Sequence, residues 1–444
     1  MKHIAIIGNG ISGTTLARHI RKKSDFRISL ISSESTYFYS RPALMYVYMG
    51  HMPFENTQPY ENFFWKKNRI DLVENHVDRI DHKNRTLYFT DKSTLVYDEL
   101  VLATGSRPRK SESPGNHLRG VQGLVSKQEL ELMEENTRGI KTAVVAGGGL
   151  IGIEMVEMLC SRGIEVHYLI REFKFWNKVL PNEESDLVAE HVRHHGVHLN
   201  LNTEIKEIKG DSTNRVTSVI TSDGNEINCG FVGIATGVIP NIDLAQSAGV
   251  ESKKGFLVNH HLETNVPGIY AIGDCAQFAQ PIAGRLEVEQ IWYTGRMQAE
   301  TLAETICGKR SEYKPQHFFN SAKLFDIEYQ VYSRVVNLDS NENDSLYWGN
   351  LKEKKSIRVF YRKSDGRFEG VTLLGIRYRH EVCDRWLKEE RHIEYVLQHL
   401  ADTNFDPEFY KHYENELLVL YNKKHNKNIQ LVRKSWKRIL GIEK

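Results

Sequence analysis

The chain has 444 residues, of which 40% are hydrophobic and 26% are charged, so it is long enough for two to four globular domains. Its 59 lysine and arginine residues nearly balance 57 aspartate and glutamate residues, so the chain as a whole has no strong positive electrostatic field that would attract nucleic acid. The composition therefore predicts no nucleic-acid partner. Five single cysteines without a CxxC pair, a first strand that begins at residue 3 and no long apolar run predict a cytoplasmic protein without a targeting or membrane-spanning segment.

A predicted buried strand at the start of the chain, His3–Ile7, runs directly into a glycine-rich turn and a helix that continues to Lys23. In the spacing GxGxxG, the first glycine allows a tight turn, the second lets the backbone approach a pyrophosphate, and the third permits close packing of helix on strand. Free N–H groups at the start of the helix then face the anion. The turn predicts a dinucleotide site at Gly8, Gly10, Ile11, Ser12 and Gly13.

The second predicted strand, residues 26–31, is followed by Glu34. This acid lies about 20 residues beyond the glycines, where a carboxylate can accept a hydrogen bond from a ribose hydroxyl. A helical, aromatic stretch then continues to Gly50. Arg41 is close enough in sequence to contact the same pyrophosphate, and the alternative is a solvated surface arginine.

Short strands are predicted at 72–80 and 86–90, and an apolar strand is predicted at 99–102. That strand is followed by Thr104 and Gly105 and then by a predicted linker at 110–120.

The opening pattern of strand, glycines and helix then returns from residue 142, with a second strand at 165–170 and a second Ala-Thr-Gly at 235–237. Two copies predict two nucleotides, one of which delivers hydride while the other stays bound. The predicted residues of the second site are Gly147, Gly149, Leu150, Ile151, Gly152 and Gly237.

The residues after the strand at 165–170 bear on the choice of coenzyme. Arg171 can bind a 2′-phosphate in a bidentate manner, whereas Glu172 repels one. The arginine slightly favours NADPH, and the coenzyme stays open between NADH and NADPH.

Four histidines gather at His191, His194, His195 and His198. The i, i+4 spacing of His191 and His195 suits a metal ion. No flanking acid or cysteine completes the ligand set, and Gly196 is expected to end the helix between them. We therefore expect solvated surface histidines and no metal site.

A third motif, Gly273 and Asp274, follows a predicted strand. Alone, this aspartate is typical of a turn or a helix cap. Together with the two glycine loops and the two Ala-Thr-Gly segments, it resembles the two-dinucleotide family of FAD and NAD(P)-dependent oxidoreductases, which has the pyridine nucleotide-disulfide reductase-like fold. The resemblance covers roughly residues 1–375. The segment Tyr39 to Pro42 and a third domain make it strongest to ferredoxin and rubredoxin reductases and apoptosis-inducing-factor-like proteins.

The resemblance implies an α/β fold with two Rossmann-like domains. A FAD-binding domain of residues 1–110 and 252–310 carries an inserted NAD(P)-binding domain of residues 111–251. Glu34 and Arg41 join the first loop in holding the ADP half and phosphates of FAD, and Asp274 binds the ribityl chain. NADH or NADPH occupies the second loop, with Glu154 near the nicotinamide. A helix that starts near Glu289 points its positive end at the isoalloxazine.

The chain departs from the family in the helix after its second strand. Residues 43–49 lack the CxxxxC of disulfide reductases and the single cysteine of peroxide-handling oxidases, which excludes a thiol relay there. Cys160 and Cys275 are interpreted as packing cysteines. Tyr46 stands where ferredoxin reductases usually have a lysine near the flavin. No catalytic acid or base is expected, because hydride transfer needs positioning.

From Tyr313 the sequence turns β-rich, with a hairpin predicted at 357–362 and 368–375. This part resembles the family's C-terminal interface domain, here 311–380, which covers the flavin and often forms dimers. Residues 381–444 are predicted to be a helical extension that ends in a basic amphipathic helix at 428–440. That helix is predicted to pack on the protein's own core, to lie on an anionic membrane or to dock an acidic electron carrier.

The sequence therefore predicts a FAD-dependent NAD(P)H:acceptor oxidoreductase that passes electrons directly outward. A ferredoxin-like or rubredoxin-like iron–sulfur protein is the favoured acceptor. A peripheral membrane NAD(P)H:quinone reductase and a redox-sensing binding protein like apoptosis-inducing factor are the alternatives.

Overall fold

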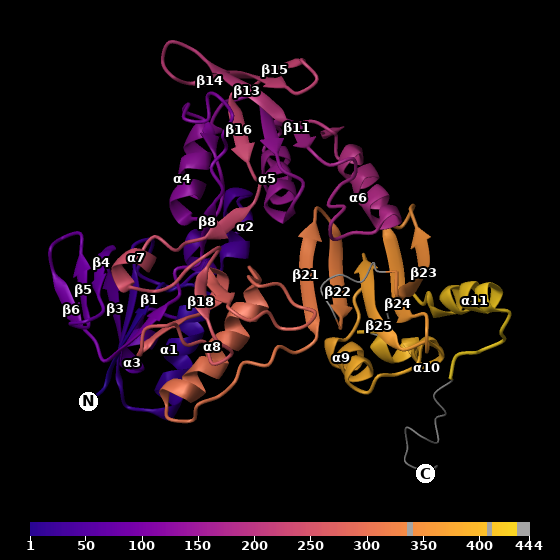
Figure 1. The fold of residues 1–444 in the computed structure, drawn as a ribbon. Helices are drawn as coiled ribbons and strands as arrows, with labels where there is room; N and C mark the ends of the chain where they lie inside the picture. The colour runs from indigo at the N-terminus through magenta and orange to yellow at the C-terminus, as the bar shows by residue number, and fades with distance from the viewer. Residues whose placement is uncertain (335–340, 406–410, 433–444) are drawn as a thin grey trace. The chain divides into compact units, whose positions relative to one another are not determined.

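The structure is a computed structural model that describes residues 1–334, 341–405 and 411–432. Its contacts divide the chain into two compact units (Figure 1). The first comprises residues 1–177 and 192–315, and the second comprises residues 178–191 and 316–444. The first unit therefore contains both glycine loops.

The first unit begins with a five-stranded parallel sheet in the order β19-β7-β1-β2-β3. Every residue of β1 (His3–Ile7) is buried, as in the central strand of a parallel sheet. Because β1 lies between β2 and β7, the strand order reverses beside the turn that follows β1, and ligands bind at such switch points. The other elements are β2 (Arg27–Ser32), β3 (Ile70–Glu74), β7 (Glu99–Leu102), β19 (Ile269–Ala271), α1 (Ile11–Lys23) and α8 (Trp292–Ile306), and the two helices pack on each other.

A second five-stranded parallel sheet, in the order β12-β11-β10-β16-β9, repeats this arrangement. Its strand β10 (Thr142–Ala146) lies between β11 and β16, so a second switch point follows β10, where α5 (Leu150–Ser161) begins. The predicted α/β fold with two Rossmann-like sheets is confirmed. The remaining elements are β9 (Val121–Gln122), α4 (Lys127–Asn136), β11 (Glu165–Ile170), β12 (His198–Leu201) and β16 (Phe231–Ile234).

Smaller elements flank both sheets. The antiparallel ribbon of β8 and β17 joins residues that follow the two Ala-Thr-Gly segments. The other elements are α2 (Leu44–Tyr48), α3 (Phe63–Lys67), β4 (Val77–Asp81), β5 (Thr86–Phe89), β6 (Thr94–Val96), β8 (Ser106–Pro108), β13 (Ile205–Gly210), β14 (Val216–Thr221), β15 (Glu226–Asn228), β17 (Val238–Pro240), α7 (Ala245–Ala248), β18 (Phe256–Val258) and β20 (Ala276–Phe278).

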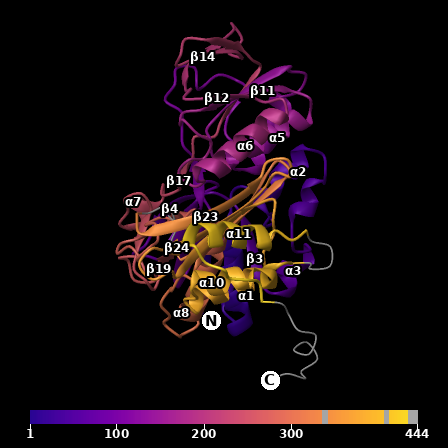
Figure 2. The same ribbon diagram turned by 90° about the vertical axis from the view of Figure 1, so that its right-hand side faces the viewer.

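The second unit is built on an antiparallel sheet in the order β21-β22-β25-β24-β23. The predicted hairpin is confirmed as β24 and β25. Helix α9 packs on β22 and β25, α11 packs on β23, and α10 packs on α11 (Figure 2). The elements are β21 (Phe318–Leu324), β22 (Ile327–Ser333), β23 (Asn343–Asn350), β24 (Lys355–Arg362), β25 (Phe368–Leu374), α9 (His380–Lys388), α10 (Ile393–Gln398) and α11 (Glu414–His425).

The predicted basic helix at 428–440 is wrong at its start. Residues 427–432 are not helical, and the remaining positions of that prediction lie outside the described residues. The side chain of Asn422 bonds both the N–H and the carbonyl of Ile429, at 2.9 Å each, and Val432 N–H donates to Gln398. This segment therefore packs on its own unit as far as Val432. Within residues 1–334, 341–405 and 411–432, no helix has the length and apolarity that a membrane crossing requires.

A buried ion pair stabilises the second unit. Helix α6 (Asn182–His194) places Glu184 in its first turn, fully buried, and Arg358 of β24 meets this carboxylate in a bidentate pair at 2.7 and 2.9 Å. The same guanidinium donates to Glu183 at 2.7 Å. Burial raises the pKa of Glu184, and the charge and hydrogen bonds of Arg358 act against that rise. Removing Arg358 would leave the carboxylate buried without a partner.

We therefore predict that Arg358→Met destabilises the second unit by about 3 kcal/mol at neutral pH. Because burial raises the pKa of Glu184, the carboxyl protonates more readily in the folded state, so the loss should shrink as the pH falls from neutral toward 5. Unfolding in urea, followed by circular dichroism at both pH values, measures the difference.

The matched control is Arg362→Met on the same strand, because Arg362 pairs with the exposed Asp365. The loss of unfolding free energy in this control should be much smaller than in Arg358→Met, because solvent screens an exposed ion pair. An equal loss of unfolding free energy in the two variants, or a loss for Arg358→Met that does not change with pH, would contradict the role given to the buried pair.

Candidate functional site

The first glycine loop is made of contacts that only glycine permits. Gly8 has a φ of +112°, and a Cβ there would lie 2.0 Å from the carbonyl oxygen of Ala103 at the end of β7. A Cβ on Gly13 would lie 1.9 Å from the carbonyl oxygen of Gly8. Gly10 differs, because nothing lies within 4 Å of its Cβ position. The fold thus explains Gly8 and Gly13, and Gly10 leaves open space at the switch point.

The helix that follows presents its N–H groups toward this space. Helix α1 starts at Ile11, and no side chain caps it. A Cβ on Gly273, or on Gly295 of α8, would lie 2.4 Å from Oγ of Ser12, so the Ser12 side chain is packed between the two glycines. Ser12 can therefore offer a ligand its backbone N–H, as an anion site at a helix N-terminus requires.

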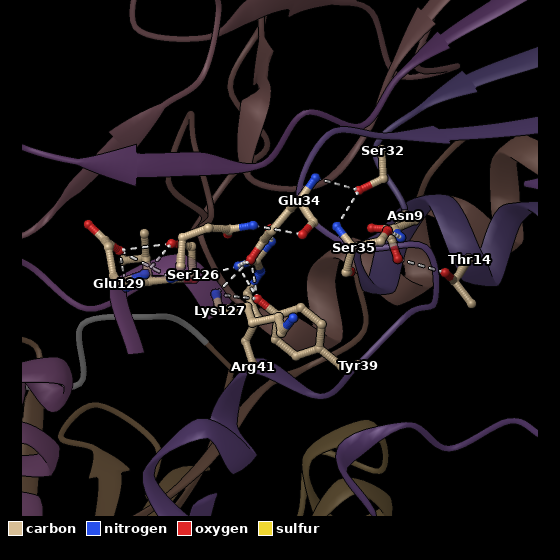
Figure 3. A network of polar contacts seen from close by, with 12 residues as sticks. Asn9, Thr14, Ser32, Glu34, Ser35, Tyr39, Arg41, Ser126, Lys127 and Glu129 are labelled. Carbon is tan, nitrogen blue, oxygen red and sulfur yellow. Dashed lines mark hydrogen bonds and ion pairs between the residues drawn. The ribbon is translucent and has the colours of Figure 1, made fainter. Parts of the chain in front are cut away.

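Glu34 and Arg41, both predicted at this site, form an ion pair (Figure 3). The Glu34 carboxylate accepts from Arg41 Nη1 at 2.9 Å, from the Tyr39 hydroxyl, and from the N–H of Lys127 at 3.1 Å. Burial alone would raise the pKa of Glu34, but Arg41 and these hydrogen bonds hold it below its usual value. The carboxylate is thus ionised at neutral pH and can accept from a ribose hydroxyl next to Arg41.

The contact of Glu34 with the start of α4 was not predicted. Ser126 and Glu129 form a capping box there, and Arg41 also donates to the carbonyl of Val125. The sequence Ser-Lys-Gln-Glu at 126–129 carries the capping-box signal and predicts this helix start. It does not predict that the helix start lies against Glu34.

Asp274 lies close enough to Arg41 for the two charges to interact. Its Oδ2 accepts from the Ser106 hydroxyl at 2.9 Å, and Ser106 Oγ accepts from Gln290 Nε2 at 2.7 Å. Burial raises the pKa of Asp274, although Ser106 and Arg41 act in the opposite direction. The Ser106 hydroxyl thus joins Asp274 to the turn that follows Gly105, which has a φ of +69°.

The neighbouring predicted residues hold the loops in place. The Thr104 hydroxyl donates to the carbonyl of Asn241 at 2.6 Å. Helix α8 begins at Trp292, three residues after the predicted start near Glu289. Glu289 is buried beside Arg285 and accepts from the Thr294 hydroxyl at 2.9 Å. The carboxylate therefore lies at the N-terminal end of α8, as the dipole favours.

The second loop repeats the first in detail. Gly147 has a φ of +125°, and its Cβ position is 2.1 Å from the carbonyl oxygen of Ala235 at the end of β16. A Cβ on Gly152 would lie 2.0 Å from the carbonyl oxygen of Gly147, while Gly149 has nothing within 4 Å. Helix α5 also starts without a side-chain cap. The partly exposed predicted residues Leu150, Ile151 and Glu154 lie on α5, and Gly237 follows β16.

Arg171 lies at the carboxyl end of β11, where a 2′-phosphate would bind. Its side chain is 64% exposed, and its guanidinium faces two acids, Glu172 at 3.1 Å and Glu204 at 3.9 Å. Sequence reasoning missed Glu204, because it comes from the segment between β12 and β13. The surplus of negative charge acts against a 2′-phosphate.

The cysteines of the chain are all free, at the five positions 160, 229, 275, 307 and 383. Cys275 is fully buried, and burial raises its pKa, as predicted for a packing cysteine. Cys160 is only partly buried, with a pKa raised by burial to about 11. Tyr46 of α2 stacks on His51.

The prediction of solvated histidines is wrong for His191, which is buried and contacts the Asp326 carboxylate. His194, His195 and His198 are exposed. Glu165 Oε1 lies 2.8 Å from Nε2 of His198 and 4.0 Å from Nε2 of His167, a group of potential metal ligands that the sequence did not reveal. It forms because β11 and β12 place His167 opposite His198.

A profile of the pyridine nucleotide-disulphide oxidoreductase family matches residues 2–299. The chain belongs to this family. The predicted family and enzyme class are thereby confirmed, and this oxidoreductase belongs to the class that uses FAD and NAD(P)H. The two loops fit such cofactors, because each leaves open space only at its middle glycine.

Curated relatives include the ferredoxin reductase component of chlorobenzene dioxygenase from Cupriavidus sp. (strain PS12), which is 31% identical over 83% of this chain and 88% of its own length. The NADH oxidase of Methanocaldococcus jannaschii is 32% identical over 73% of this chain and 74% of its own length. A nitrite reductase of Bacillus subtilis is 29% identical over 84% of this chain, which spans 44% of that protein.

Solved structures with the same fold include a ferredoxin reductase from Rhodopseudomonas palustris, with a TM-score of 0.78, 25% identity, and coverage of 92% of this chain and 96% of that one. A NAD-dependent persulfide reductase from A. fulgidus has a TM-score of 0.83 at 23% identity, and the match covers 96% of this chain and 84% of that one. Because the identity to the persulfide reductase is only 23%, that similarity is evidence for a shared fold and not for a shared function.

The surroundings of each glycine predict whether its substitution affects folding or cofactor binding. We predict that Gly13→Ala destabilises the first unit by about 3 kcal/mol, because its Cβ meets the Gly8 carbonyl. Gly10→Ala should fold normally but lower FAD affinity about tenfold, because the methyl group fills the open space. Thermal unfolding of the apoprotein and fluorescence titration with FAD measure the two effects.

Gly149→Ala is the matched control, because it sits at the corresponding position of the second loop. It should keep FAD and raise the KM for NAD(P)H. If Gly10→Ala bound FAD normally, or if Gly149→Ala lost FAD, the assignment of the loops would be wrong.

Proposed function

We propose that this oxidoreductase passes electrons from NAD(P)H to a small iron–sulfur protein. The observation that carries the proposal is the pair of dinucleotide loops in a chain whose five cysteines are all free. Because the chain has no disulfide that could take up electrons, the electrons leave the resident cofactor directly for an external acceptor. The relatives named chlorobenzene dioxygenase ferredoxin reductase component and rubredoxin-NAD(+) reductase, the latter from Pseudomonas putida, support such an acceptor.

We assign the first loop to the pyrophosphate of FAD and the second to that of NAD(P)H. In this assignment, Glu34 and Arg41 hold the ribose and phosphates of the ADP half, and Asp274 holds the ribityl chain. Residues 1–110 and 252–310 form the FAD domain, 111–251 the NAD(P) domain, 311–380 the interface domain and 381–444 the extension. Support comes from the repeated switch points and the open space at Gly10 and Gly149.

Bound FAD supplies a two-electron acceptor that can release electrons singly. The protein's own groups position the reactants, since hydride transfer needs alignment rather than an acid or base. The N–H groups at the start of α1 and α5 bind and orient the two pyrophosphates. Helix α8 would favour the reduced, anionic isoalloxazine with its positive N-terminal end, and Glu154 would orient the nicotinamide.

We propose NADH as the preferred coenzyme, in place of the slight preference for NADPH that Arg171 suggested. Glu172 and Glu204 both face the Arg171 guanidinium, so a 2′-phosphate would meet two carboxylates. The hydroxyl of NADH carries no charge and meets no such repulsion.

Accordingly, the double variant Glu172→Gln/Glu204→Gln should raise kcat/KM for NADPH about tenfold and leave that for NADH within about twofold. Steady-state reduction of ferricyanide with each coenzyme measures both values. The control is Glu207→Gln, an exposed acid on β13. A wild type that prefers NADPH would show that Arg171 dominates, and the NADH proposal would be wrong.

Other features stay proposals: a cytoplasmic location, a homodimer formed through the interface domain, and peripheral membrane contact through the basic C-terminal segment. Two further functions compete with the favoured one. A quinone reductase would rely on the basic C-terminal segment, and a redox-sensing binding protein would use coenzyme binding to change its contacts.

One experiment separates the three functions. We expect reduced holoenzyme, prepared anaerobically with NADH, to be reoxidised by a ferredoxin or rubredoxin at least about tenfold faster than by a soluble naphthoquinone at equal concentration. Stopped-flow absorbance of the flavin measures both rates. Faster reoxidation by the quinone would establish the reductase alternative, and slow reoxidation by every acceptor with a coenzyme-dependent change in sedimentation would establish the sensing alternative.

A further inference from the structure

A cavity of about 390 Å³ lies over the ribbon of β8 and β17 in the first unit. Its apolar lining comes from Val238, Ile239, Pro240, Ile242 and Val288. Ligand pockets commonly have a few hundred Å³ and an apolar lining with a few polar groups. The cavity therefore has the size and the lining of a site for a small molecule.

The remaining lining is strongly cationic, from Arg107, Arg109, Lys253 and Lys254. Arg107 pairs with Asp243 at 3.2 Å, and Lys254 lies 3.6 Å from Glu287. These pairs are exposed and hence weak. No acidic partner of the Arg109 or Lys253 side chain occurs in the part of the chain that the structure describes. The lining thus keeps a positive charge that only an incoming anion can neutralise.

Hydrogen bonds also link the lining of the cavity to Asp274 of the candidate site. Gln290 lines the cavity and donates to Ser106 Oγ at 2.7 Å, and Ser106 donates to Asp274 at 2.9 Å. A group that binds in the cavity and engages the Gln290 amide is therefore linked to Asp274 by a chain of three hydrogen bonds, its own bond to Gln290 included. Occupancy of the cavity can change the environment of the residue assigned to the flavin side chain.

We propose that this cavity binds a small organic anion, a flat apolar body that carries one sulfonate, carboxylate or phosphate group. The apolar lining takes the body, and Arg109 and Lys253 take the anionic group. This site goes beyond the proposed function, because neither glycine loop contributes to it. Its effect on the flavin through Gln290 rests on the proposed function.

The probe is 2-naphthalenesulfonate, which is flat, anionic and not reducible by the enzyme. Calorimetric titration of the holoenzyme should show one site per chain. The double variant Arg109→Gln/Lys253→Gln should bind at least about tenfold more weakly. The control Arg138→Gln/Lys141→Gln removes the same charge from exposed positions elsewhere in the first unit, and its Kd should stay within about twofold of wild type. Added salt should weaken the wild-type binding.

The flavin spectrum gives a second reading. Binding should perturb the absorbance of the wild type, and Gln290→Ala should abolish most of that change while keeping the heat of binding. FAD content and reduction by NADH, measured on the same samples, test the proposed function separately.

No binding at millimolar probe, or equal weakening in the control variant, would overturn the proposal. Retention of an acidic iron–sulfur protein by the wild type and its release by Arg109→Gln/Lys253→Gln, without binding of the probe, would assign the cations to protein docking and would also overturn it.

Discussion

The structure depends on a steric constraint at the carboxyl ends of two central strands. The chain after β1 passes so close to the end of β7 that a Cβ on Gly8 would be 2.0 Å from the Ala103 carbonyl, and the helix start then packs on Gly8 itself through Gly13. The same two contacts recur at Gly147 and Gly152. Because of them, each helix can start directly at the switch point with its N–H groups toward open space. The proposed placement of both nucleotides depends on this constraint.

The strands, helices and fold class could be predicted because their signals are local. Strand β1 is buried at every position and apolar from Ile4 to Ile7, and the glycine spacing stands at the junction with α1. The repeat of that pattern at residue 142 predicts the second sheet, and the structure bears this out through the order β12-β11-β10-β16-β9.

The surroundings of individual side chains and the conformation of the segment after α11 could not be predicted, because they depend on contacts between segments far apart in the chain. Glu34 meets the start of α4, which lies 93 residues further along. His191 looked like a surface residue because Asp326, its partner, follows much later in the sequence. The segment after α11 has a helical pattern, yet residues 427–432 are not helical, and the Asn422 side chain bonds the backbone of Ile429. In each case a tertiary contact decides the outcome over the local pattern.

The free cysteines limit how many electrons this chain can store. A chain with a redox-active disulfide stores a second pair of electrons, whereas this chain has only its cofactor for storage. The measurement that tests the central claim most directly is therefore an anaerobic titration of the purified holoenzyme with NADH, followed by flavin absorbance. We predict one FAD per chain and complete bleaching by a single equivalent of NADH. A protein that holds no FAD, or one that consumes two equivalents before it is fully reduced, would contradict the account.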